Sequence, residues 1–224
     1  MTDGLSGELT DELSAGLTDE DLRAALAGAA ADPAWLAGAV HRVSASPAAI
    51  SGLFPAVSRR CGRGLLPAGH PGLAGWTVDD VGRVLLLTAL PLRGPALATE
   101  AGLLYRCGDA AEKRGVLRAL PWLNIGAGGV ELLHDAIRSN DPRLVAAALG
   151  PYATHLADPI WRQAVLKCVF MDIPLSVVSG ISGRADHELG RMLADLADER
   201  RAAGRAMPAD ADALLAQLTG AEAG

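Results

Sequence analysis

Apolar residues recur at helical spacing along most of the chain, and polar residues fill the positions between them. In the middle of the chain, Val116, Leu117 and Leu120 follow Lys113 at intervals of three, four and seven residues. A second stripe, near the carboxyl end, consists of Leu189, Met192, Leu193 and Leu196. This pattern predicts amphipathic helices, and no segment of convincing length has the two-residue period of a β-strand.

Helix starts are marked by side chains that accept hydrogen bonds from the first free backbone N–H groups. The spacing of a capping box is found in the pairs Thr18–Asp21, Thr77–Asp80 and Asp109–Glu112. Asp-Pro pairs, in which proline takes the first helical position, occur at residues 32–33, 141–142 and 158–159. We expect helices to begin at these points and near Asp186. The helices expected at residues 95–107 and 110–120 should form an antiparallel hairpin, because their connection is short.

The length of 224 residues suits one hydrophobic core, so one helical domain is expected over residues 18–220. Residues 1–17 are rich in Gly, Ser, Thr and acids, which predicts a disordered acidic tail. Within the domain, residues 44–75 are predicted to be irregular and free of long helices. This segment contains many glycines and the prolines Pro47, Pro55, Pro67 and Pro71.

The composition favours helix-on-helix packing. Hydrophobic residues make up 50% of the chain but aromatic residues only 4%, so Ala, Leu and Val supply most of the apolar surface. The fold class is therefore predicted to be all-α. We expect a single-domain array of antiparallel helix pairs, either solenoid-like and helical repeat-like or an irregular bundle.

The charge excludes one broad class of partner. The formal net charge is -6, whereas a surface that follows nucleic-acid phosphates needs a basic excess, so no nucleic acid is expected as a partner. No apolar run reaches the roughly 18 residues that span a bilayer, so at most peripheral membrane association is expected. The opening "MTDGLSGELTDELSAGL" has no positive leader, which predicts a cytoplasmic protein.

The three cysteines suggest neither a disulfide framework nor a zinc knuckle. Cys61, Cys107 and Cys168 are far apart and form no C-x-x-C pair, so reduced thiols are expected. Cys107 and Cys168 lie in apolar helices and are interpreted as core thiols.

Lys167 is the most conspicuous polar residue of an apolar segment, "IWRQAVLKCVFMDIPL" at residues 160–175. On a helical wheel, Gln163 and Lys167 form a narrow polar stripe on a helix that is otherwise mostly apolar. One interpretation is that the stem of Lys167 packs while its ammonium reaches water or an internal carboxylate. The other is that Gln163 and Lys167 line a ligand cleft.

A second candidate site is the stretch "SRRCGRG". It places Arg59, Arg60 and Arg63 in a glycine-containing loop, where guanidinium groups and backbone N–H groups suit a phosphate or carboxylate. A solvated surface loop is the alternative.

His134 and Asp135 form a pair of residue types found in metal-dependent phosphohydrolases, but His41, His70 and His155 lie in no matching pattern. No metal site and no cofactor are therefore expected, and His134 is interpreted as a hydrogen-bonded helix residue. Serine-hydrolase and phosphate-loop motifs are absent from the sequence.

The charged residues of the last long helix are interpreted as its solvated face, with ion pairs at three- or four-residue spacing. They are Glu188, Arg191, Asp195, Glu199, Arg200 and Arg201.

Several blocks taken in order resemble the EboA family of bacteria. They are "FPAVSRRCGRGLL", "GWTVDDVGRVLLL", "RCGDAAEKRGVLRAL", "DAIRSND", "WRQAVLKCVFMDIPL" and "ISGRADHELGRMLADLADERRAAGR". The resemblance covers roughly residues 20–207. The residues that match its most recognisable blocks are Tyr105, Gly108, Asp109, Arg114, Arg118, Arg138, Pro151, Tyr152, Gln163, Lys167, Arg184, Glu199, Arg200 and Arg205.

The resemblance implies a helical protein of secondary metabolism, encoded in an operon with a prenyltransferase-like membrane enzyme, a TatD-like hydrolase and sugar-metabolism-like enzymes. The operon is associated with moving secondary metabolites or their precursors out of the cytoplasm. The resemblance supplies no catalytic residues to carry over.

Three functional hypotheses follow. The leading one is a non-catalytic accessory protein that binds a small metabolite, anionic or prenylated, or another protein of the ebo operon. The rival is an enzyme in which Lys167 is an acid, base or anion anchor and converges with Tyr152 and with Arg138 or Asp135. The third is a scaffold that docks another protein through a helix face.

Overall fold

The computed structural model describes residues 17–67 and 72–220, and this part of the chain is all-α, as predicted. The predicted acidic tail falls outside the described residues except for Leu17. The α-helices are α2 (Asp19–Leu26), α3 (Pro33–Ala45), α4 (Ile50–Leu53), α5 (Val57–Cys61), α6 (Val78–Thr88), α7 (Gly94–Cys107), α8 (Ala110–Ala119), α9 (Val130–Arg138), α10 (Pro142–Ala148), α11 (Asp158–Phe170), α12 (Ile181–Arg184), α13 (His187–Ala202) and α14 (Ala209–Gly220). Four short 3-10 helices join them, at Pro47–Ala49, Leu120–Trp122, Pro151–His155 and Leu175–Val177.

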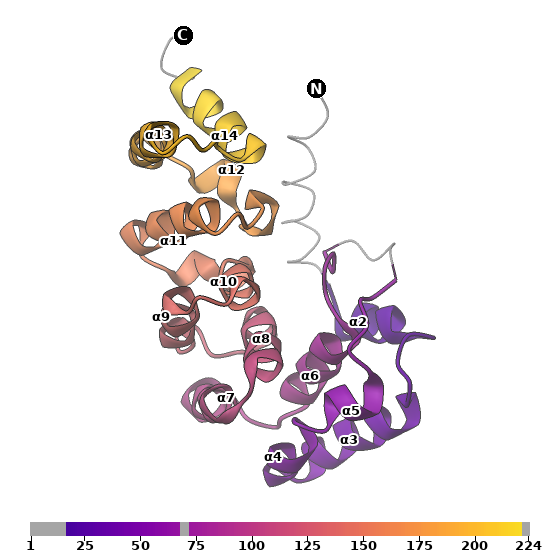
Figure 1. The fold of residues 1–224 in the computed structure, drawn as a ribbon. Coiled ribbons are helices and arrows are strands. Elements are labelled where there is room, and N and C mark those ends of the chain that lie inside the picture. Colours follow the sequence, from indigo (N-terminus) through magenta and orange to yellow (C-terminus); the bar gives the residue numbers. More distant parts are fainter. Residues whose placement is uncertain (1–16, 68–71, 221–224) are drawn as a thin grey trace.

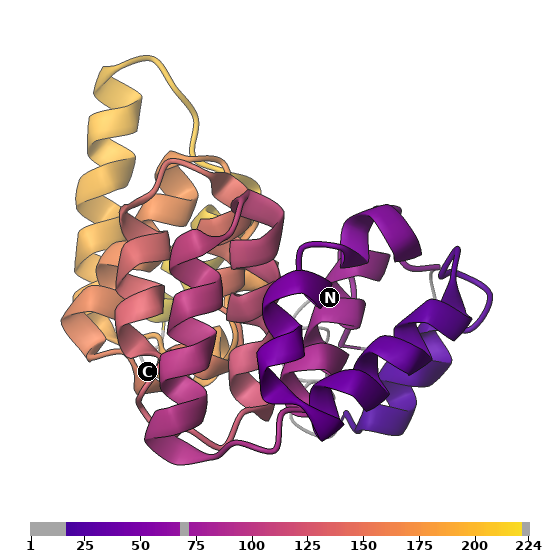
Figure 2. The same ribbon diagram turned by 90° about the horizontal axis from the view of Figure 1, so that it is seen from below.

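The helices follow one another in space much as they do in the sequence. From α6 and α7 the ribbon climbs through successive helices to α14, while α2 to α5 lie on the other side of α6 (Figure 1). Figure 2 shows the same grouping from below, with the indigo and purple helices beside the later ones. Helix α8 packs on α6, α7 and α10, and α13 packs on α14. Whether the array has the regular repeat of a solenoid stays a prediction.

The predicted helix starts are largely confirmed. Thr18 and Asp109 cap α2 and α8 in capping boxes, and Asp80 accepts the N–H of Thr77 at 3.0 Å at the start of α6. Further N-caps are Asp32, Asp141 and Asp186. Helix α11 differs by one residue, because Ala157 is its N-cap and Asp158 its first residue.

The described part of the proline-rich segment contains the short helices α4 and α5 and a 3-10 helix, and one expectation for its arginines was wrong. Arg59 and Arg60 belong to the last turn of α5 instead of a glycine-containing loop, and only Arg63 follows the helix. Gly62, with φ of 101°, ends α5 in a conformation that side-chain-bearing residues rarely adopt.

A cluster of charges lies inside the protein between α6 and α8. Asp79, Asp80 and Arg83 of α6 are buried, with residue exposures of 1%, 0% and 1%. Arg114 and Arg118 of α8 reach both oxygens of Asp80, and Arg114 Nε lies 2.8 Å from Oδ1. We call these five residues the α6–α8 ion network, and it joins the two helices through their most buried polar groups.

A neighbouring residue of α5 completes the hydrogen bonds of the network. Arg83 donates to Asp79 at 2.6 Å and to Ser58 Oγ at 2.7 Å, and the Ser58 hydroxyl donates to Asp79 at 2.8 Å. Burial by itself would raise the pKa of the Asp79 carboxyl, but hydrogen bonds from Thr77, Arg83 and Ser58 outweigh it and lower that pKa. Asp79 is therefore held in its ionised form.

Gly115 makes room for the stem of Arg83. A Cβ atom at this position of α8 would lie 2.6 Å from Arg83 Cδ and 3.1 Å from Arg83 Cβ. Because α6 and α8 approach so closely here, the glycine is needed for space and not for an unusual backbone conformation.

Replacing Asp80 by asparagine should strongly destabilise the protein. The change removes the counter-charge of two partly buried guanidinium groups, and breaking a buried pair in this way costs about 3–5 kcal/mol. Urea denaturation would measure the free energy of unfolding. Asp198→Asn is the control, because Asp198 pairs with Arg201 at the surface, where both side chains are more than three-quarters exposed. Equal effects of the two substitutions would contradict a structural role for the network.

Alanine at two helical glycines should have opposite effects. Gly115→Ala should lower stability by about 1–3 kcal/mol, because its methyl group overlaps Arg83. Gly38→Ala in α3 meets no atom within 4 Å and should raise stability by up to about 1 kcal/mol through helix propensity. Thermal and urea unfolding of both variants would check the signs, and a stabilising Gly115→Ala would show that α6 and α8 are less tightly packed.

Candidate ligand pocket

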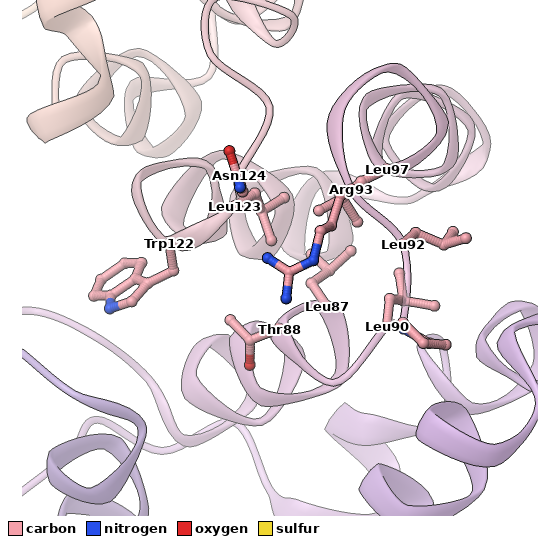
Figure 3. Close-up of a pocket in the computed structure, with 10 residues that line it drawn as sticks. Leu87, Thr88, Leu90, Leu92, Arg93, Leu97, Trp122, Leu123 and Asn124 are labelled. Carbon is pink, nitrogen blue, oxygen red and sulfur yellow. The ribbon is translucent and has the colours of Figure 1, made fainter.

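A pocket of about 300 Å³ lies where the end of α6, the start of α7 and the segment after α8 meet. Figure 3 shows its lining side chains. They are Leu87, Thr88, Leu90, Pro91, Leu92, Arg93, Leu97, Trp122, Leu123 and Asn124. We call it the Arg93 pocket, after the charged residue in its lining.

Local structure explains how these segments come together. Helix α6 ends at Thr88, and Pro91 and Pro95 keep the next helix from continuing it. The N–H of Gly94 then donates to the carbonyl of Asn124 at 2.8 Å, which ties the linker to the segment after α8. Gly94 has φ of 53°, so the backbone at this junction favours glycine.

The pocket combines an apolar floor with few polar groups. Leu87, Leu97 and Leu123 are buried, whereas Arg93 and Asn124 are exposed. The hydroxyl of Thr88 donates to the Leu85 carbonyl at 3.3 Å. Apolar walls with a small number of convergent polar groups are typical of small-ligand sites.

Aromatic contacts connect the pocket to the α6–α8 ion network. The rings of Trp76 and Trp122 meet edge to face with centroids 5.6 Å apart. The guanidinium of Arg118 lies 4.8 Å from the Trp76 ring centroid while it also binds Asp80. Trp122 Nε1 donates to the Leu17 carbonyl at 3.2 Å, so the wall of the pocket is held from two sides.

Lys167 lies away from this pocket and binds the end of another helix. Its Nζ donates to the carbonyls of Ile137 and Ser139 at 2.6 and 2.7 Å. These are among the carbonyls that the end of α9 leaves without helical partners. The internal acceptors are thus main-chain carbonyls instead of a carboxylate, and a cation is favourable at this end of a helix.

Tyr152 also joins backbone segments. It is buried, its hydroxyl donates to the carbonyl of Gly126, and it accepts the N–H of Gly129 at 3.0 Å. A Cβ atom on Gly129 would lie 3.1 Å from this hydroxyl, which explains the glycine. Burial raises the pKa of Tyr152, so the phenol stays protonated.

Gln163 and Arg138 are exposed side chains. Gln163 lies on α11 and is exposed. The Arg138 side chain is 69% exposed, and its Nη2 atom lies 3.6 Å from Asp135 Oδ1. Asp135 also accepts a hydrogen bond from the Tyr105 hydroxyl at 3.0 Å, and its carboxylate lies 4.0 Å from Lys113 Nζ. The lining of the Arg93 pocket includes none of the predicted site residues Gln163, Arg138, Lys167 and Tyr152.

The arginines of the expected anion site lie in and just after α5. Arg60 lies 3.9 Å from Asp32 and 5.9 Å from the centroid of the Trp35 ring. Arg59 and Arg63 are exposed. The anion site expected here stays a prediction.

Two smaller expectations were wrong. Cys107, the last residue of α7, is exposed and is not a core thiol, whereas burial of Cys168 raises its pKa to about 12. Arg200 is buried although its neighbours on α13 face solvent. It donates to the carbonyls of Ala206 and Val169 and lies 3.3 Å from Asp172, so it ties α13 to the end of α11.

His134 lies in α9 with Nδ1 3.4 Å from Glu131. In the described parts of the chain, no three His, Cys, Asp or Glu side chains gather as a metal site requires. Over the same residues, none of the helices combines the length and the apolar character needed to cross a bilayer.

The sequence patterns did not point to the Arg93 pocket. One signal was present, because Arg93 precedes a helix at a position where Ser, Thr, Asp or Asn would normally accept the first N–H groups. Its partners in the lining come from three separate segments, which no local pattern brings together.

The described residues form an all-α protein with a pocket between helix ends. A family model described as metabolite traffic protein EboA matches residues 67–215, and the chain therefore belongs to the EboA family. The matched range contains the whole Arg93 pocket but not the arginines at 59, 60 and 63. No curated protein and no solved structure matches the chain.

Lys167→Met should reduce the stability of the protein. Methionine keeps most of the apolar stem but leaves the carbonyls of Ile137 and Ser139 without their donor, at a cost of roughly 1–3 kcal/mol. Gln163→Met, one turn earlier on the same helix, is the exposed control. Urea denaturation compares the two variants. Unchanged stability of Lys167→Met would show that these two hydrogen bonds do not stabilise the fold.

Proposed function

We propose that this EboA-family protein is an accessory protein of a bacterial secondary-metabolite trafficking system and that it binds a small metabolite in the Arg93 pocket. The observation that carries the proposal is the pocket itself, with a volume of about 300 Å³ and buried leucines on its floor. This volume is at the lower end of the range of small-ligand sites. The description of the family as a metabolite traffic protein supports the same role.

The lining of the pocket suits binding better than catalysis. Its polar side chains are those of Thr88, Arg93 and Asn124, and none of these is a general acid or base near neutral pH. The rival hypothesis of an enzyme centred on Lys167 gains no support, because the ammonium of Lys167 is held by two main-chain carbonyls. Retention of a ligand without changing it is what a trafficking role requires.

A trafficking protein also has to receive and release its ligand. The proposal therefore includes contact with other proteins of the ebo operon and at most peripheral membrane association. The exposed lining residues Pro91, Arg93 and Asn124 show that the pocket opens to the surface, where such a transfer would take place.

The test is to isolate the tagged protein from its own host and to identify co-purified small molecules by mass spectrometry. We expect a compound enriched with the wild-type protein and with Thr99→Phe, and lost with Thr88→Phe. Both threonines are helical and donate their hydroxyls to backbone carbonyls, but only Thr88 lines the pocket. The phenyl ring at position 88 should fill the pocket.

Circular dichroism and thermal unfolding of both variants are the control for folding. The proposal fails if no compound depends on Thr88 while both variants remain folded. It also fails if the bound compound is retained by Thr88→Phe, since the ligand would then lie elsewhere.

A further inference from the structure

We infer that the Arg93 pocket takes a compact amphipathic anion, with a short apolar body and a single anionic head such as a carboxylate or a phosphate monoester. This inference rests on the proposed binding function and specifies the chemistry of the ligand. The apolar body would lie on the buried leucines, and the head would bind the guanidinium of Arg93.

The position of Arg93 supports this assignment. Figure 3 shows its guanidinium among the labelled side chains that line the pocket. The amide of Asn124 is a second donor in the lining for such an anion, whereas the Thr88 hydroxyl donates to the Leu85 carbonyl. The attached apolar group would then extend toward the leucines.

The charge of the lining favours an anion. Arg93 is the only ionisable residue among the ten that line the pocket. Among the described residues, no carboxylate lies within ion-pair distance of its guanidinium, whereas Arg83, Arg114 and Arg118 all have acidic partners. A guanidinium stays charged at every physiological pH and binds carboxylate and phosphate oxygens in pairs.

The start of α7 adds to the positive potential. Arg93 is the N-cap of this helix and makes no side-chain cap hydrogen bond. A cation is electrostatically unfavourable at a helix N-terminus, and a bound anion would reverse this effect. The cavity and its apolar lining define the site, and the helix end only strengthens its preference for negative charge.

The size and the single charge narrow the ligand further. A volume of about 300 Å³ corresponds to roughly ten water molecules in the liquid, so a long prenyl or fatty-acyl chain would extend beyond the pocket. One guanidinium pairs with the oxygens of one carboxylate or phosphate group, so the second phosphate of a diphosphate would have no cationic partner in the lining. A ligand with one anionic group and a short apolar body satisfies both limits.

The experiment compares probes that share one apolar chain and differ in the head group. Octanoate, octanol and octylamine would be titrated calorimetrically into the wild-type protein, Arg93→Gln and Arg106→Gln. Arg106 is the matched control, because it is an exposed arginine of the same helix that does not line the pocket. Octyl phosphate adds a second kind of anionic head group. Hexadecanoate keeps the carboxylate of octanoate and lengthens the chain.

We expect the wild-type protein and Arg106→Gln to bind octanoate at least about tenfold more tightly than octanol, as one charge-assisted contact allows. Arg93→Gln should remove this difference, and octylamine should bind most weakly to the wild-type protein. Thr88→Phe should abolish octanoate binding. Octyl phosphate identifies which anionic head is preferred, and hexadecanoate should gain little affinity over octanoate.

Equal binding of octanoate and octanol, a preference for octylamine, or an unchanged preference in Arg93→Gln would overturn the assignment of an anionic ligand. Absence of octanoate and octyl phosphate binding would also overturn it. The proposed binding function would still stand in these cases if a host compound depends on Thr88, so the two proposals fail separately. A large gain for hexadecanoate would refute the compact size.

Discussion

The pairing of Asp80 with Arg114 and Arg118 is the interaction on which the rest of the structure depends. A carboxylate with no exposed surface needs charged partners, and these partners come from a helix that begins thirty residues later in the chain. The pairing therefore fixes α8 against α6. Because the Arg93 pocket is built from the end of α6 and the segment that follows α8, its shape depends on the same contact.

Elsewhere, long polar side chains bind the ends and turns of the short helices. Lys167 binds the end of α9, Arg200 the end of α11, and Arg184 the carbonyls of Ala153 and Leu156. Short helices leave a large share of their backbone groups unpaired, and these side chains supply the missing donors. Many residues that carry the resemblance to the EboA family thus have structural partners, which explains why no catalytic set emerged from them.

The pocket differs from these contacts because its charged residue has no such partner in the described structure. Arg118 stacks on Trp76, and Trp76 meets Trp122 at the wall of the pocket, so the ion network supports the wall through two aromatic rings. Arg93 belongs to the linker between α6 and α7, and no carboxylate of the described residues pairs with its guanidinium. A wall supported by aromatic contacts, next to an unpaired cation, is the feature on which the proposed binding of a small anion rests.

The sequence by itself determined the helical class and most helix starts, because these features arise within a few residues. Thr77 and Asp80, for example, meet across a single turn. Only the tertiary structure decided the partners of Lys167, which lie 30 and 28 residues away, the burial of Arg200 and the position of the pocket. The physical reason is that Arg93, Thr88 and Asn124 become neighbours only when the packing of α6, α7 and α8 brings their ends together.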